Sequence, residues 1–155
     1  MMWRIRGGSL QKIADAYVPF WLFRVRYEMA KALQTRLFAM EVVEGALDLF
    51  EFAKSPNETQ VQGLVTTNYL RPALNAARAE ELLRQKVLRI VFQQGFFKLR
   101  QARLEVKREA GELYLPYWLG FYGRDGRVRC RVFDAIRRRM EGSKASAFFE
   151  EWLAA

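Results

Sequence analysis

Arginines alternate with apolar residues in three segments of this 155-residue chain. The residues singled out by this spacing, and by the run that follows the last segment, are Arg24, Arg26, Arg127, Arg129, Arg131, Arg137, Arg138 and Arg139. Side chains two positions apart in a β-strand point to the same face of a sheet. The pattern therefore predicts a strand face that carries guanidinium groups, which bind phosphate or carboxylate oxygens in pairs.

The charge balance leaves the partner of this face open. The net charge is +9, and residues 98–139 contain twelve basic residues against five acidic ones. Such a face could bind the phosphates of nucleic acid, with exposed tyrosine or tryptophan as a stacking surface. It could instead face an acidic protein, or only solvent, because charged rows also protect sheet edges from aggregation. We expect a binding or structural module of unknown partner, with sequence-nonspecific nucleic-acid binding as the alternative.

Most familiar catalytic chemistry is missing from the sequence. There is no histidine and one cysteine, which excludes Ser-His-Asp and Cys-His catalysis, the common zinc sites and an intrachain disulfide. We therefore predict no catalytic residue, metal ligand or cofactor, although an enzyme built on carboxylates, lysine, tyrosine or arginine stays open. Cys130 alternates with arginines, so we interpret it as a buried apolar residue.

A short phrase occurs twice, as YVPFWL at residues 17–22 and as YLPYWL at residues 114–119. Tryptophan is rare, so the two copies indicate a duplicated unit. Trp21 and Trp118 are expected in the core, since a buried tryptophan contributes much apolar area. The alternative is that they line a pocket, which would make the chain a carrier of a small apolar ligand.

A second, weaker match aligns residues 40–46 with residues 130–136 and pairs Glu44 with Asp134. The two matches differ in offset by about seven residues, which we place at a hairpin tip, where insertions cost little. The unit is then a strand, a turn and a returning strand. Glu44 and Asp134 could be catalytic carboxylates, but acids at strand ends more often form turns or pair with arginine.

The elements that position these residues are expected to be strands and helices of an α+β domain. Strands are predicted at residues 3–6, 17–27, 36–52 (with a break near Gly45), 103–107, 113–122 and 127–136, and helical turns at residues 9–15 and 28–34. Asp125-Gly126 predicts a tight hairpin turn. The fold class is an antiparallel sheet made from a duplicated hairpin and covered by a long central helix and a short C-terminal one.

The helices follow from their apolar spacing. A long helix is predicted after Thr67 or Asn68, with Gly95 as its end, and a final helix capped by Ser143. The domain prediction is one domain, 1–155, with related units at about 1–54 and 96–155 joined by a connection and helix at about 55–95. The long helix could also pair with a second copy of the chain.

Targeting features are few. No apolar run reaches the roughly 20 residues of a membrane span, and the first residues lack the pattern of a secretory signal. We therefore expect a cytoplasmic protein, or a fragment of a larger one, with no membrane span.

Overall fold

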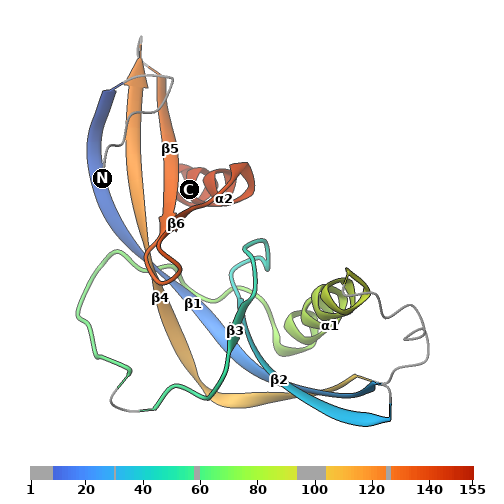
Figure 1. Cartoon of the computed structure of the whole chain (residues 1–155). Coiled ribbons are helices and arrows are strands. Elements are labelled where there is room, and N and C mark those ends of the chain that lie inside the picture. The colour runs from blue at the N-terminus through green and yellow to red at the C-terminus, as the bar shows by residue number, and fades with distance from the viewer. Residues whose placement is uncertain (1–8, 30, 58–59, 94–103, 125–126) are drawn as a thin grey trace. The chain divides into compact units, whose positions relative to one another are not determined.

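The computed structural model describes residues 9–29, 31–57, 60–93, 104–124 and 127–155. Over these residues it contains an antiparallel sheet in the order β3-β2-β1-β4-β5-β6, together with two helices (Figure 1). The strands are β1 (Ser9–Met29), β2 (Ala32–Glu41), β3 (Phe50–Phe52), β4 (Glu105–Arg124), β5 (Arg127–Asp134) and β6 (Arg139–Met140), and the helices are α1 (Ala76–Gln93) and α2 (Ser143–Ala154). The predicted α+β class with an antiparallel sheet is confirmed.

The chain divides into two compact units that do not follow chain order. The α1 unit contains Pro19–Val65 and Pro72–Leu113, and the α2 unit contains the chain up to Val18, Thr66–Arg71 and Tyr114–Ala155. The long strands β1 and β4 therefore contribute one half to each unit. The boundaries predicted from the sequence assumed that each unit is continuous in the chain, and a single domain of two related units stays a prediction.

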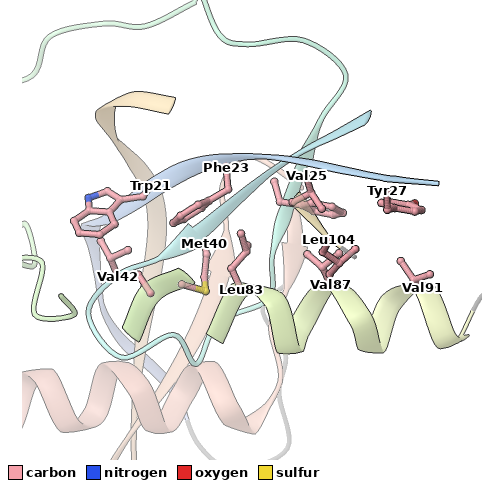
Figure 2. Close-up of a cluster of buried hydrophobic side chains, with 12 residues drawn as sticks. Trp21, Phe23, Val25, Tyr27, Met40, Val42, Leu83, Val87, Val91 and Leu104 are labelled. Carbon is pink, nitrogen blue, oxygen red and sulfur yellow. The ribbon is translucent and has the colours of Figure 1, made fainter. Parts of the chain in front are cut away.

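The α1 unit has a core between one face of its strands and α1. Alternate residues of β1 point to this face, and a stripe of α1 at every fourth position packs against them. Figure 2 shows Trp21, Phe23, Val25, Tyr27, Met40, Leu83, Val87 and Val91 in this cluster. α1 begins at Ala76, later than predicted, because its first turn follows Asn75, whose side chain accepts a hydrogen bond from the Arg78 amide at 2.8 Å.

The α2 unit has a core formed by α2 on β4 and β5. The ring of Tyr117 lies 5.5 Å from that of Phe149 between centroids, and the amide of Cys130 donates to Glu150 Oε1 at 3.3 Å. Val132 is buried on the same side. The apolar stripe predicted for the last helix therefore packs on the sheet (Figure 1).

Several local predictions are wrong. Residues 9–15 and 28–34, predicted as helical turns, belong to β1 and β2 or to the turn between them, and Glu28 pairs with Leu33 across that hairpin. Pairing between strands overrides the local helix preference there. The N-cap of α2 is Gly142 and not Ser143, with no side-chain cap. The predicted strand at residues 3–6 and the helix end at Gly95 lie outside the described residues.

Candidate functional site

The two tryptophan phrases lie at equivalent positions of two hairpins. In the first, Trp21 faces Met40 across β1 and β2, and in the second, Trp118 faces Phe133 across β4 and β5. Both hairpins close in two residues, since Met29 pairs with Ala32 and Arg124 pairs with Arg127. Beyond its tryptophan pair, the first hairpin has eight further residue pairs and the second has six. The first hairpin is therefore longer by four residues on the tip side of the tryptophan, where about seven were predicted, and an insertion in a duplicated unit stays a prediction. The turn residues 125–126 themselves lie outside the described residues.

The second hairpin has one face covered by α2 and an opposite face that is exposed in part. α2 covers the side that carries Tyr117, Cys130 and Val132. Because neighbouring residues of a strand point to opposite sides, Trp118 and Arg131 point away from α2. We call this side the open face, and it comprises Trp118, Gly120 and Tyr122 of β4, Arg129, Arg131 and Phe133 of β5, and Met140 of β6. Trp118, Arg129, Arg131 and Met140 are its exposed residues, whereas Gly120, Tyr122 and Phe133 are buried.

Trp118 is the central side chain of the open face. It is 47% exposed, and its ring packs at 6.0 Å, tilted by 38°, against the buried ring of Phe133. Arg131 faces Gly120, which has no side chain. Arg129 and Arg131 are exposed and form no ion pair with the residues that the structure describes. The open face therefore joins an exposed aromatic ring to two positive charges that no described acid pairs with.

Trp21 has the opposite environment. It is 7% exposed, its Nε1 donates to Glu112 Oε1 at 3.2 Å, and the guanidinium carbon of Arg108 lies 3.5 Å from its ring centroid. The other side of this hairpin is buried near Phe20, which packs edge-on against Phe50 at 5.8 Å, and is exposed further along β1 at Arg24 and Arg26. Trp21 is thus a core residue, as expected. The pocket hypothesis for Trp21 and Trp118 stays a prediction, and the two residues belong to different compact units.

The other predicted arginines have different environments. Arg24 pairs with Glu109 at 2.8 Å between Nε and Oε1, and Arg137 lies 3.6 Å from Asp134 and 3.9 Å from Glu141. Arg139 is 3.7 Å from Glu141. Arg26 and Arg138 are exposed, but Arg26 belongs to the α1 unit and Arg138 to a turn with a positive φ of 55°. The side chain of Arg127 lies outside the described side chains.

Two buried acids organise the turns that follow the hairpins. Glu41 accepts hydrogen bonds from the amides of Val43 and Glu44 through Oε2 and from those of Ala46 and Leu47 through Oε1. In the second hairpin, Asp134 Oδ1 accepts from the amides of Ile136 and Arg137, both at 2.9 Å. Both carboxylates are fully buried. They form turns, which is the interpretation favoured for acids at strand ends.

The alignment that paired Glu44 with Asp134 is wrong by three residues in the first hairpin. Glu41 faces Phe20 and Asp134 faces Tyr117, so Glu41 is the counterpart of Asp134. The turn also contains Gly45, with a φ of 73° and an ideal Cβ position only 2.9 Å from Leu82 Cδ1 of α1. The break predicted near Gly45 is therefore present, as the turn between β2 and β3.

Cys130 lies under α2, as its alternation with arginines predicts. Burial, and to a lesser degree the nearby Glu150, raises the pKa of its thiol to about 11. A thiol that stays protonated at neutral pH is a poor nucleophile. Across the described ranges, no group of three or more potential metal ligands is present.

A second aromatic pair extends the row begun by Trp118. Tyr114 points to the same side of β4, and its ring meets that of Tyr69 edge-on at 6.1 Å. Tyr69 reaches this position because its segment pairs in parallel with β1 at Tyr17, where the Leu70 amide donates to the Tyr17 carbonyl at 2.9 Å. Both rings are partly exposed.

Sequence reasoning found the arginines of the open face but missed the exposure of Trp118 and the Tyr69–Tyr114 pair. A two-residue turn at Asp125-Gly126 predicts a register in which the numbers of two facing residues always have the same sum. This register places Arg131 opposite Gly120 and Trp118 opposite Phe133, as observed. That signal was present in the sequence. The position of Tyr69 depends on a long connection and had no local signal.

No described helix is long and apolar enough to cross a membrane. Comparison of the chain with protein-family models, curated proteins and solved structures found no match. Its function is therefore inferred from the geometry of the described residues alone.

Proposed function

We propose that this chain is a non-catalytic binding module that holds nucleic acid, without sequence preference, on the open face of the α2 unit. The observation that carries the proposal is the exposed Trp118 beside Arg129 and Arg131, neither of which is paired with a described acid. Guanidinium groups suit phosphate oxygens, and an exposed ring suits a base.

The charge distribution supports this reading. The chain has a net charge of +9, which attracts polyanions over distances of about a Debye length. Within the α2 unit, the acids closest to the strand ends are already engaged, since Asp134 serves a turn and Glu141 lies near Arg137 and Arg139. The exposed basic residues of this unit include Arg129 and Arg131 of the open face, together with Lys12, Arg71, Arg138 and Lys144.

A non-catalytic role fits the state of the buried acids. Glu41 accepts hydrogen bonds from backbone amides of its own turn through both carboxylate oxygens. Asp134 does so through Oδ1, and its Oδ2 lies 3.6 Å from Nη1 of Arg137. A general acid or base must instead reach a substrate proton. The two carboxylates are thus better explained as structural groups. Binding of a ligand on the open face requires no catalytic residue.

We also infer that the two hairpins descend from one duplicated unit. The support is the repeated phrase, the matched tryptophan registers and the matched buried acids that follow each hairpin. On this view the first copy kept its tryptophan in a core and the second copy presents it to solvent.

The test is fluorescence anisotropy with labelled 20-nucleotide DNA and RNA, single-stranded and duplex, at about 50 and 200 mM salt. The variant Arg129→Ala/Arg131→Ala is compared with Arg26→Ala/Arg138→Ala, which removes two exposed arginines outside the open face. We expect binding that weakens with salt. The first variant should lower the log–log salt slope for single strands by about 1.4, because each lost phosphate contact contributes about 0.7.

The control pair should bind within about twofold of the unchanged protein, since removing an exposed charge outside the contact surface alters only the general attraction. Absence of salt-dependent binding at 50 mM would contradict the proposal. Equal loss in both double variants would place the contact elsewhere on the chain. Equal competition by poly-glutamate would favour an acidic protein partner.

A further inference from the structure

We infer that the open face selects single-stranded nucleic acid, with one base stacked on Trp118 and the neighbouring phosphates held by Arg131 and Arg129. This inference rests on the proposed function and names the form of the ligand. Its basis is the alternation of an exposed ring and exposed guanidinium groups on two adjacent strands.

The ring of Trp118 packs against a buried ring and is partly exposed. Phe133 supports it at 6.0 Å, and nearly half of its surface is open. A ring backed by a buried neighbour loses little further side-chain freedom when a base covers it, so the entropic cost of binding is low. This is the arrangement of a stacking platform and differs from Trp21, whose ring is covered by Arg108.

The arginines are placed beside this ring. Arg131 faces Gly120 and is the diagonal neighbour of Trp118. Arg129 comes two residues before Arg131 on β5 and faces Tyr122. Residues two apart on one strand are separated by roughly 7 Å. Guanidinium groups on that spacing can hold an extended backbone that passes along the strand.

The aromatic row continues in the other direction along β4. Tyr114 lies four residues before Trp118 on the same side, roughly 13 Å away along the strand, and meets Tyr69 edge-on at 6.1 Å. An isolated phosphate or a small acid would not use a row of this length. A strand with successive unpaired bases would, because every base has a face that stacks on an aromatic ring.

A duplex fits this surface less well. Its bases are stacked on one another and paired, so their faces are not available to stack on Trp118. An acidic peptide offers carboxylates to the arginines but no succession of flat rings to Trp118. The aromatic contribution therefore distinguishes single strands from both other ligands.

The experiment measures binding of 20-nucleotide oligo(dT), a mixed single strand of RNA and a 20-base-pair duplex at about 50 mM salt. Trp118→Leu removes the aromatic ring and keeps an apolar side chain, while Trp118→Phe keeps a ring. We expect Trp118→Leu to weaken single-strand binding by about 5- to 100-fold and duplex binding by less than twofold. Trp118→Phe should restore most of the single-strand affinity.

A second readout is tryptophan fluorescence during the same titration. Stacking of a base on Trp118 should quench the emission of the unchanged protein, and Trp118→Phe should bind without that component of the quench. Thermal unfolding of each variant confirms that the hairpin is folded, which is expected for a half-exposed side chain.

The outcomes separate the two proposals. Salt-dependent binding that treats single strands and duplex alike, with no effect of Trp118→Leu, would overturn this inference and leave the proposed function standing. Loss of affinity in Trp118→Phe equal to that in Trp118→Leu would also overturn stacking. No binding of any nucleic acid would overturn both.

Discussion

The two hairpins carry the same tryptophan phrase and use it in opposite ways. In the α1 unit the helix covers the face that carries Trp21, and the other face is also buried around Phe20. In the α2 unit the helix covers the face that carries Tyr117, and Trp118 is left exposed. The hairpin sequence thus fixes which residues share a face, while the packing of the helix decides which face is left for function.

The two helices also present different side chains to their strands. α1 offers a narrow stripe of Ala79, Leu83, Val87 and Val91, which fits against the large aromatic residues of β1. α2 offers Phe148 and Phe149, whose rings pack edge-on at 5.1 Å and meet Tyr117 of β4. In the α1 unit the strands supply most of the aromatic volume of the core, and in the α2 unit the helix supplies a large share of it.

Replacing each tryptophan by alanine is the most direct test of the contrast between the two hairpins. Trp21→Ala should lower the free energy of unfolding by about 4 kcal/mol, because a buried indole and its contacts with Arg108 and Glu112 are lost. Trp118→Ala should cost below about 1 kcal/mol, because nearly half of that side chain is already in water. Urea unfolding of both variants measures the difference. Similar losses would contradict the assignment of one tryptophan to a core and the other to a surface.

The buried acids give the next largest contrast. Glu41→Ala leaves four backbone amides without their acceptor and should cost about 3 kcal/mol, whereas Asp134→Ala frees two amides and should cost about 2 kcal/mol. Glu41→Gln keeps one acceptor oxygen and should fall between the unchanged protein and Glu41→Ala. Chemical denaturation provides the values. A Glu41→Ala variant as stable as the unchanged protein would show that the turn after β2 does not depend on its acid.

Alanine substitutions at two glycines of the α1 unit test how strongly contact with α1 constrains the turn after β2. Gly45→Ala combines an unfavourable positive φ with a Cβ position 2.9 Å from Leu82, so we expect a loss of about 2 kcal/mol. Gly111→Ala shares the positive φ, at 96°, but its added carbon would meet open space, and the loss should be about 1 kcal/mol. Thermal unfolding of the two variants shows which substitution destabilises the protein more. The reverse order would mean that contact with α1 does not constrain this turn.

The smallest expected effect concerns Cys130 at alkaline pH. Its folded-state pKa of about 11 lies above the unfolded value of 9.0, so the folded state holds its proton longer. The contribution to stability is complete below about pH 9 and is lost as the pH rises toward 11, with a loss of about 1 kcal/mol at pH 10. Urea unfolding of the unchanged protein and of Cys130→Ala across this range isolates the effect. Parallel pH profiles would contradict the raised pKa.

Much of the fold could be predicted from local patterns. The α+β class, the tight Asp125-Gly126 hairpin register and the packing of the last helix followed from alternation, turn residues and helical spacing. The length of β1 could not be predicted, because residues 9–15 and 28–34 have helix-compatible patterns and become strand only through pairing with neighbours. Ladder pairing is a tertiary effect that a local window does not contain.

The candidate site was predicted in part. Arg129 and Arg131 were correctly placed on one strand face, because a period of two is read from sequence alone. Arg24, Arg137 and Arg139 proved to be near acids that are distant in sequence or in a following turn, which spacing does not reveal. The exposure of Trp118 depends on which face the helix covers, and that choice depends on packing between elements.

The most direct test of the central claim maps where a single strand contacts the chain. Oligo(dT) that contains 5-iodouracil is bound at low salt, cross-linked with ultraviolet light and analysed by peptide mass spectrometry. We predict cross-links within residues 114–131, which contain Trp118, and none at Trp21. Cross-links concentrated in residues 19–29, or spread evenly over the basic segments, would contradict the assignment of the open face as the binding surface.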